Sequence, residues 1–571
     1  TDPHGHPDKR LLVPRNIPMM EFTRMEIPSI DRVTGIAASD EFLSGTGTLT
    51  IPPNSEVTLL FDQEELVMAY PVIDMSGGKG GTISMTYAEA LYDENGRNGN
   101  RDVIEGKTIQ GYYDEILPDG GQHRVYSSLW FRTYRYLQLD IVTGDDPLEL
   151  HEMYTLYSAY PFEQNARFVG DDESLEDIWN VGWRTARMCA METYFDCPYY
   201  EQLQYVGDTR IQALISLYVS GDDRLVRNSI EAFEHSRLPS GLTESRYPSY
   251  QEQIIPPYSL MWIAMIYDYW MHRDAEPYVE QYLTPIRNVV EYYARYVDET
   301  GILGAMPWWN FVDWSFPRGV PPGGDEGFSS IITLQYIYVL QYAHDMADAY
   351  DRQSDMEYYQ GLLKQLTDGV MQTCWDESRG LFADTPNKES FSQHANVMAV
   401  LTDLIPEHEQ EELMELVLSE EDLVQCTYYY RFYLHQAMNK VGMGDRYISA
   451  LEPWREMLDL GLTTFAEEPD PTRSDCHAWS ASPNYDLLAT VCGIRPASPG
   501  FQTVKISPAL GELRWIEGSV PHPAGDIIVE LKQRRRDGIQ GTVTLPDGLT
   551  GEFEYGDETL QLKPGKNSIK M

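Results

Sequence analysis

Cysteine is scarce in this sequence, and its spacing excludes several kinds of site. Only six cysteines occur among 571 residues. None of them forms the Cys-x-x-Cys pair that zinc clusters and thioredoxin-type redox sites require, and six are too few for a disulfide scaffold in a chain of this length. We therefore expect buried free thiols. His408 and His435 have no partners at metal-ligand spacing, so no metal site is predicted.

Positive charge is scarce as well. Lysine and arginine together number 43, against 89 aspartates and glutamates, which gives a net charge of −46. A surface this acidic repels the phosphates of DNA and RNA and the head groups of anionic lipids. Nucleic acid is therefore excluded as a partner. The excess of carboxylates fits either a salt-tolerant surface or an acidic enzyme with no special habitat.

Long apolar runs and nucleotide or nucleophile motifs are absent. No stretch approaches the roughly 20 apolar residues of a membrane span, so no membrane association is expected. The polar start of the chain shows no signal peptide, so any targeting segment has been removed or never existed. The compartment stays open, and a secreted or periplasmic protein whose targeting segment has been removed is the favoured interpretation. Without a P-loop, a Gly-x-Gly-x-x-Gly fingerprint or a Gly-x-Ser-x-Gly elbow, nucleotide-binding and serine-hydrolase functions have no support.

Three sequence patterns follow one another along the chain. Strand-like alternation with turn signals occupies residues 42–160, and helical periodicity then predicts twelve helices between residues 173 and 493. After a segment rich in proline and glycine, the period of two returns. The predicted domains are an N-terminal β-sandwich with a leading extension (1–165), a helical domain (166–495) and a C-terminal β-sandwich (496–571).

The connections between the predicted helices alternate in length. Short connections of about one to five residues alternate with long ones of about nine to thirty residues. Short loops join antiparallel neighbours, so all the long loops must emerge at one end of the helical array. Twelve helices in this up-and-down order suit a closed (α/α)₆ barrel. Long loops on a rigid scaffold commonly carry binding and catalysis.

The first long loop places three carboxylates, Asp196, Glu201 and Asp208, among the tyrosines Tyr200 and Tyr205. Like charges held close together, and partial burial, raise the pKa of a carboxyl group. A general acid that works near neutral pH needs such a raised pKa. The structural alternative is that Asp208 caps the following helix and that Asp196 accepts hydrogen bonds from loop amides.

The last long loop is also acidic and aromatic, and it contains Glu467, Glu468 and His477. In a closed ring the first and last helix pairs are neighbours, so Glu201 and Glu467 would face each other across the mouth. Two carboxylates across a sugar-sized cleft are what glycoside hydrolysis requires. Glu468 competes with Glu467 for the second position, and a solvated acidic turn is the structural alternative.

The longest loop is dense in tryptophan. Trp308, Trp309 and Trp314 lie within seven residues, and Asp313 precedes the last of them. Indole faces stack on the C–H faces of sugar rings, and a neighbouring carboxylate can bind hydroxyl groups. The alternative is a hydrophobic plug that closes one end of the barrel.

Taken together, these loops resemble the bacterial α-L-rhamnosidases, glycoside hydrolase family 78. The resemblance covers about residues 60–571, and the order of a β-domain, a barrel and a β-sandwich also matches. The residues that carry it are Asp196-Cys197-Pro198, Glu201, Gly207-Asp208, Thr463-Thr464 with Glu467, Cys476-His477 with Trp479-Ser480, and Gly493-Ile494-Arg495-Pro496 with Pro499-Gly500-Phe501.

The resemblance implies an inverting, exo-acting hydrolase without a cofactor, acting on an oligosaccharide, a polysaccharide or another glycoside that carries terminal α-L-rhamnose. Glu201 would be the general acid, and Glu467 would be the base that activates water. Inversion requires a separation of roughly 6.5–9.5 Å between the two carboxyl groups. The residues expected to bind the sugar are Asp196, Tyr200, Tyr205, Asp208, Trp309, Asp313, Trp314 and His477.

The sequence also departs from the family pattern. Many members carry an arginine shortly before the acid and a tryptophan before the Gly-Asp pair, where this chain has Tyr200 and Tyr205. Ala466 replaces a tryptophan beside the predicted base. These departures leave the acid assignment in place and alter the expected contacts to the sugar ring.

Other functions fit the same scaffold. A polysaccharide lyase would use a tyrosine or a histidine to remove a proton beside a uronate, but acidic mouth loops repel such anionic substrates. A glycosidase of the same barrel type with a different glycone is a closer alternative. A non-catalytic sugar-binding protein is a third, although an intact acid and base pair argues against it.

Overall fold

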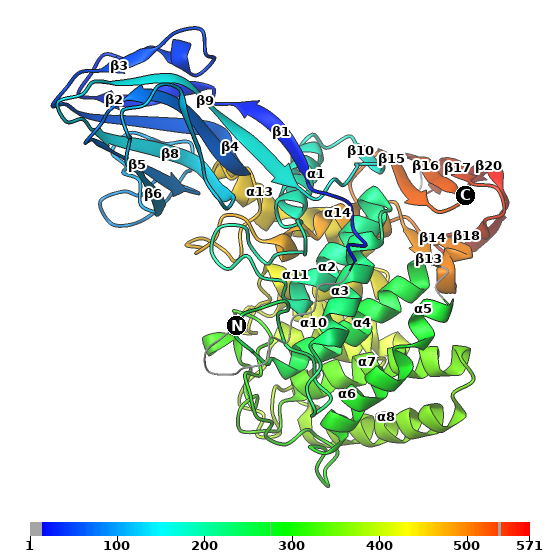
Figure 1. The fold of residues 1–571 in the computed structure, drawn as a ribbon. Helices are drawn as coiled ribbons and strands as arrows, with labels where there is room; N and C mark the ends of the chain where they lie inside the picture. Colours follow the sequence, from blue (N-terminus) through cyan, green and yellow to red (C-terminus); the bar gives the residue numbers. More distant parts are fainter. Residues whose placement is uncertain (1–13, 274–275, 535–537) are drawn as a thin grey trace.

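The computed structural model describes residues 14–273, 276–534 and 538–571. A β-rich N-terminal region, a helical central region and a β-rich C-terminal region follow one another along the chain (Figure 1). The first thirteen residues of the predicted leading extension lie outside the described residues. Within the described part of the chain, no helix is long and apolar enough to cross a membrane.

The N-terminal region is built on one nine-stranded hydrogen-bonded sheet of order β1-β9-β4-β8-β5-β6, in which β2 and β7 also pair with β4, and β3 pairs with β9. Its longest strand, β4, pairs with β8 along its first part and with β9 along its second. The strands are β1 (Glu21–Glu26), β2 (Ser29–Thr34), β3 (Leu49–Ile51), β4 (Glu56–Gly77), β5 (Thr82–Ala88), β6 (Tyr112–Ile116), β7 (Arg124–Ser127), β8 (Arg132–Val142) and β9 (Leu148–Ala159).

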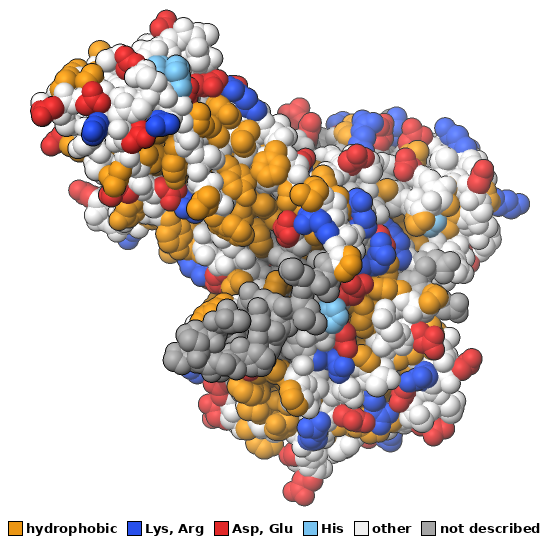
Figure 2. All heavy atoms as spheres, viewed as in Figure 1, with side chains coloured by type: hydrophobic (Ala, Val, Ile, Leu, Met, Phe, Trp, Pro, Cys, Tyr) orange, Lys and Arg blue, Asp and Glu red, His pale blue; other side chains and the backbone are white. Residues whose placement is uncertain are grey.

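Strand structure begins earlier than the sequence predicts. We expected the first strand near residue 42, whereas β1 and β2 precede it. These two strands are short and largely exposed, so they lack the apolar alternation that predicts a half-buried strand. Figure 2 shows a broad apolar area over the N-terminal region, close to its junction with the helical region.

The twelve predicted helical segments are confirmed in position, with four of them divided into shorter pieces. The fifth divides because Pro285 lacks the N–H that would bond back to Gln281. The helices are α1 (Ser174–Met188), α2 (Val206–Ile215), α3 (Arg224–His235), α4 (Pro256–His272), α5 (Glu276–Glu280), α6 (Leu283–Ala294), α7 (Ser330–Ala349), α8 (Gln353–Cys374), α9 (Gln393–Leu401), α10 (Glu407–Ser419), α11 (Tyr428–Lys440), α12 (Tyr447–Ala450), α13 (Glu452–Asp459) and α14 (Pro483–Asp486).

One series of helices is buried and forms the centre of the helical region. α2 packs against α4, α4 against α7, α7 against α9, and α9 against α11. A 3₁₀ turn at Ala478–Ala481, which precedes α14, packs against both α11 and α2, so the series returns to its start. α4 and α7 are apolar on nearly all sides, as burial requires, whereas α8 and α10 are exposed on one face.

The first and last helical segments meet at Gly182 of α1. A Cβ atom there would lie 1.9 Å from the side-chain oxygen of Asn484 in α14. The Asn484 side-chain nitrogen donates to the carbonyl of Trp179, at 2.9 Å. The absence of a side chain at residue 182 thus lets α14 approach α1 closely enough to form this bond. The contact brings the loops that follow α1 and α13 to the same part of the molecule.

The C-terminal region contains a five-stranded sheet, β10-β15-β16-β17-β20, and a four-stranded sheet, β13-β14-β18-β19. Strand β10 precedes the helices in sequence and pairs with β15, so the chain enters the helical region from the C-terminal sheet. The strands are β10 (Arg167–Gly170), β13 (Ile494–Pro496), β14 (Thr503–Ile506), β15 (Trp515–His522), β16 (Gly525–Arg534), β17 (Gly538–Leu545), β18 (Thr550–Tyr555), β19 (Glu558–Leu562) and β20 (Gly565–Lys570), with β11 (Trp375–Asp376) and β12 (Leu381–Phe382) forming a separate hairpin.

Candidate active site

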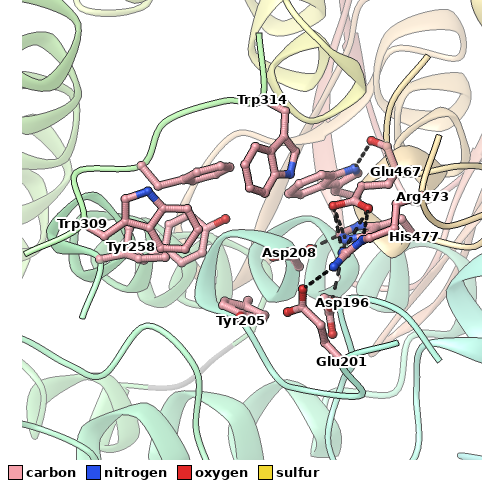
Figure 3. Close-up of a pocket in the computed structure, with 13 residues that line it drawn as sticks. Asp196, Glu201, Tyr205, Asp208, Tyr258, Trp309, Trp314, Glu467, Arg473 and His477 are labelled. Atoms are coloured by element: carbon pink, nitrogen blue, oxygen red, sulfur yellow. Dashed lines mark hydrogen bonds and ion pairs between the residues drawn. The ribbon is translucent and has the colours of Figure 1, made fainter. Parts of the chain in front are cut away.

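A pocket lies where the long loops converge, and we call it the acidic pocket (Figure 3). The loops after α1, α6 and α13 supply most of its lining, together with the first turns of α2 and α4. Its lining residues are Asp196, Glu201, Tyr205, Asp208, Ile255, Tyr258, Trp309, Phe311, Trp314, Glu467, Arg473, His477 and Trp479. Eight of the ten residues predicted from the sequence are among them.

Glu201 lies in a closed loop between α1 and α2. The backbone N–H of Asp196 donates to the Leu203 carbonyl at 2.8 Å, and the Leu203 N–H donates to the Asp196 carboxylate at 3.0 Å. Within this loop the Glu201 side chain is 28% exposed. The Asp196 carbonyl also accepts from the N–H of Ala478 at 3.1 Å, which ties this loop to the one that carries Glu467.

Glu467 lies deeper, with a side chain only 4% exposed. Its backbone N–H donates to the Ser474 carbonyl at 3.1 Å, and its carbonyl accepts from the Trp479 indole at 2.8 Å. The Trp314 side chain lies close enough to the Glu467 carboxylate to lower its pKa. Glu468 is not among the residues that line the acidic pocket. Of the two neighbouring carboxylates that the sequence left as competitors, Glu467 is the one that lines the acidic pocket.

Arg473 joins the two carboxylates. Its Nη1 donates to Glu201 Oε1 at 2.9 Å, while Nε and Nη2 donate to the two oxygens of Glu467 at 3.1 Å each (Figure 3). Because both carboxylates bond to the same guanidinium group, the distance between them is no greater than the width of that group plus two hydrogen bonds. Sequence reasoning missed Arg473, although it is the only lysine or arginine in the loop between α13 and α14.

The floor of the acidic pocket is polar, and its side chains are not simple pairs of opposite charges. Burial raises the pKa of Asp208 well above its ordinary value and, together with the charge of Glu201, raises the pKa of Asp196 to about 8. Burial also lowers the pKa of His477 well below its usual value. His477 Nδ1 lies 3.4 Å from Asp208 Oδ1. Protonated carboxyls and a neutral imidazole suit hydrogen bonds to neutral hydroxyl groups.

Aromatic side chains form the remaining wall. Tyr205 and Tyr258 meet edge to face, with ring centroids 6.3 Å apart. The ring centroids of Trp309 and Trp314 are 6.1 Å apart, and the Phe311 ring contacts both. Sugar rings present C–H faces that stack on such surfaces. Tyr258 and Phe311 were not predicted as site residues, because they lie at a helix start and between two tryptophans, where packing was the simpler interpretation.

Two predicted site residues do not line the acidic pocket. Asp313 is fully buried and accepts hydrogen bonds from His394 Nε2 at 2.8 Å and from the Thr427 N–H at 3.0 Å. It anchors the tryptophan loop to α9 and to the start of α11. Tyr200 lies behind Arg473, whose guanidinium is 5.3 Å from the Tyr200 ring centre. Sequence alone could not tell on which side of its loop each side chain would lie.

The free volume of the acidic pocket is about 40 Å³. One water molecule has a share of about 30 Å³ in the liquid, so a ring with several hydroxyl groups needs more room than this. Arg473 occupies part of the pocket, and its side chain is 43% exposed. Among the described residues, no group of histidine, cysteine, aspartate and glutamate is arranged to hold a metal ion. All six cysteines are buried and free, as predicted.

Comparison with protein families gives two matches. The bacterial α-L-rhamnosidase 6-hairpin glycosidase domain matches residues 163–491. The bacterial α-L-rhamnosidase C-terminal domain matches residues 493–570. Among curated proteins, none matches this chain.

Several solved structures share the fold. A family 78 rhamnosidase of Bacillus sp. GL1 has 23% identity and a TM-score of 0.79, over 90% of this chain and 54% of that one. A Klebsiella oxytoca rhamnosidase with rhamnose bound has 18% identity and a TM-score of 0.71, over 84% and 97%. A Streptomyces avermitilis α-L-rhamnosidase complexed with L-rhamnose has 16% identity and a TM-score of 0.70, over 95% and 53%. The chain thus spans about half the length of the Bacillus and Streptomyces proteins.

Proposed function

The chain belongs to the bacterial α-L-rhamnosidase family, and we propose that it is an exo-acting, inverting glycosidase that releases terminal α-L-rhamnose from rhamnosides. The observation that carries this proposal is the pair of carboxylates, Glu201 and Glu467, brought together on Arg473 in an aromatic pocket with a buried polar floor.

The architecture that goes with this function is a central (α/α)₆ barrel between two β-sandwiches. The closed series of contacts from α2 through α11 and back supports the barrel. The proposed domains are residues 1–165, 166–495 and 496–571. The ranges matched by the two family domains, 163–491 and 493–570, support these boundaries to within a few residues.

In the proposed mechanism Glu201 protonates the glycosidic oxygen, and Glu467 removes a proton from the water that attacks the anomeric carbon. Their different exposures fit these roles, because the acid must meet a leaving group at the mouth while the base acts from within. In the enzyme without sugar, burial raises the pKa of Glu467, and the charge of Arg473 opposes this rise. Binding of the sugar displaces Arg473 from between the two carboxylates.

The sugar itself is held by neutral contacts. Asp208 and Asp196, whose pKa values are raised, and the neutral His477 can donate or accept hydrogen bonds with the rhamnose hydroxyls. Trp309 and Trp314 cover the apolar side of the ring. Rhamnose has a methyl group in place of one hydroxymethyl group, so a partly aromatic wall suits it.

The experiment that tests the proposal is proton NMR of p-nitrophenyl α-L-rhamnopyranoside hydrolysis, followed from the first minute. We expect β-rhamnose to appear first, because water attacks the face opposite the leaving group. Early α-rhamnose would instead require a nucleophilic carboxylate and would overturn the inverting mechanism. No release of rhamnose from this or any other rhamnoside would overturn the function.

A further inference from the structure

A second groove lies where the loop that carries Glu201 meets the N-terminal sheet. It has a volume of about 230 Å³ and is bounded by strand ends of that sheet and by the stretch around residue 200. We call it the aromatic groove, and its principal lining residues are Tyr112, Trp130, Arg132, Tyr199, Tyr200 and Gln202. Nothing in the mechanism above uses it.

Two aromatic side chains of the groove are unusually open to solvent. Trp130 is 53% exposed and Tyr112 is 56% exposed. Tyr112 is held in place by stacking on Tyr199, with ring centroids 5.1 Å apart and planes inclined by 30°. Fixed aromatic faces left open to water are a common feature of sites that stack on a ring-shaped ligand.

The groove is lined by the same loop that carries the acid. Tyr200 and Gln202, which line it, flank Glu201 in sequence, and Arg473 of the acidic pocket lies against the Tyr200 ring. Gln202 has a φ of 56°, in the left-handed region that glycine favours. This backbone turns the Gln202 side chain to the groove, where its Oε1 accepts from the Trp130 indole at 2.8 Å.

The relative depth of the two carboxylates in the acidic pocket determines where the leaving group must lie. Glu201 is several times more exposed than Glu467, so the acid stands nearer the mouth. In the proposed reaction the group that leaves is bonded to the oxygen that Glu201 protonates. It therefore lies beside Glu201, whose neighbours Tyr200 and Gln202 line the aromatic groove.

The charges of the groove favour a neutral ligand. Its one cation, Arg132, is paired with Asp114 through two hydrogen bonds, at 2.6 and 3.0 Å. An anionic residue such as a uronate would find no unpaired positive charge there. A neutral ring whose C–H face lies on Trp130 and Tyr112 fits both the exposed aromatic faces and the balanced charge.

We propose that the aromatic groove binds the leaving group as a neutral pyranose ring, the sugar to which the terminal rhamnose is attached. The inference rests on the proposed function and assigns part of the specificity to the N-terminal region. A second groove, beside Trp308, shares Trp309 and Trp314 with the acidic pocket. Figure 3 shows Trp309 on the other side of the acidic pocket from Glu201. The groove beside Trp308 is therefore the competing site for the leaving group.

The test compares two substrates whose leaving groups are both alcohols and so both need the acid. One is an α-L-rhamnosyl glucose disaccharide, and the other is methyl α-L-rhamnopyranoside, which has no ring to stack. Trp130→Ala should lower kcat/KM for the disaccharide about tenfold, the effect of one lost stacking contact, and lower it much less for the methyl glycoside. Trp130→Phe keeps a ring but loses the bond to Gln202, so it should retain most of the disaccharide activity.

Trp308→Ala is the matched control, because Trp308 is 55% exposed and lies in the competing groove. It should leave the ratio of the two substrates unchanged. An equal loss on both substrates in Trp130→Ala, or a selective loss in Trp308→Ala instead, would overturn the assignment of the groove. If Trp130→Phe fell as far as Trp130→Ala, the indole would act only by positioning Gln202. A wild-type enzyme that hydrolyses neither substrate would overturn the proposed function, and this inference with it.

Discussion

At the scale of single residues, the acidic pocket assigns different tasks to carboxylates that look alike in sequence. Glu201 stands near the mouth, Glu467 lies deep, and Asp196 and Asp208 have raised pKa values within the floor. Burial and the position of Arg473 create these differences. The roles proposed for Glu201 and Glu467 can therefore be separated by experiment.

Glu201→Gln and Glu467→Gln should each lower kcat by about 10² to 10⁴, because each removes one partner of the acid and base pair without changing its shape. The two losses should differ in their dependence on the leaving group. A p-nitrophenyl group needs little protonation, so Glu201→Gln should lose less activity on the aryl rhamnoside than on methyl rhamnoside. Glu467→Gln should lose similar activity on both. Steady-state kinetics on the two substrates measures this.

Glu468→Gln is the control for that pair, since Glu468 neighbours the proposed base but does not line the acidic pocket. Its kinetics should stay close to those of the wild type. A large loss in Glu468→Gln together with an active Glu467→Gln would transfer the role of base to Glu468.

Arg473 should control the pH dependence of the base. Its charge opposes the burial that raises the pKa of Glu467, so Arg473→Met should raise that pKa further. The base works ionised, and activity is lost as the pH falls through its pKa. The acid limb of the kcat/KM profile should therefore move to higher pH. Arg473→Lys keeps the charge and should move the limb less; equal shifts in both variants would show that the two-pronged hydrogen bond matters more than the charge.

At the scale of elements, the approach of α14 to α1 holds the two carboxylate loops together. Gly182 permits this approach, since a Cβ atom there would lie only 1.9 Å from the Asn484 side chain. The same contact forms where the central series of helices returns to its start. Helix packing therefore determines the geometry of the acidic pocket as much as the loops themselves do.

Gly182→Ala should lower the free energy of unfolding by about 1–3 kcal/mol, because the added methyl group overpacks this contact. Gly361→Ala in α8 is the matched control. Nothing lies within 4 Å of a Cβ atom at residue 361, so alanine should stabilise that helix by up to about 1 kcal/mol. Denaturant unfolding of both variants measures the difference. A Gly182→Ala protein as stable as the wild type would mean that α14 shifts without cost.

At the scale of the whole molecule, the dominant property is the net charge of −46. Many arginines are paired with carboxylates on the surface, such as Arg24 with Glu152 and Arg446 with Glu415. Exposed pairs of this kind contribute about 0–1 kcal/mol each, and salt weakens them. Salt also screens the repulsion among the unpaired carboxylates, and that repulsion acts over the whole surface.

We expect repulsion to be the larger effect, so sodium chloride should raise Tm. Most of the rise should occur below about 0.3 M, where the screening length shortens to less than about 8 Å. A thermal melt over a salt series measures it. A Tm that falls with added salt would show that the surface ion pairs outweigh the repulsion, and the acidic surface would then be no adaptation to salt.

Much of the local structure could be predicted from the sequence. Apolar residues recurring at the helical period located the twelve helical segments, and prolines explain where some of them divide. The pattern was weaker where burial was weaker, and β1 and β2 were missed for that reason. The pairing of β10 with β15 was also missed, because a four-residue strand has too few residues to show a period.

The sequence by itself determined which residues are present to do chemistry: the acidic loops, the tryptophan loop and the order of the helices that carry them. Only the tertiary structure decided which of these side chains face one another. In the tertiary structure Asp313 is buried in the core, Tyr200 lies against Arg473, and Arg473 lies between Glu201 and Glu467. Local periodicity reports burial along one segment. A contact such as that between Arg473 and Glu201 joins loops 272 residues apart, and it depends on how all the helices pack.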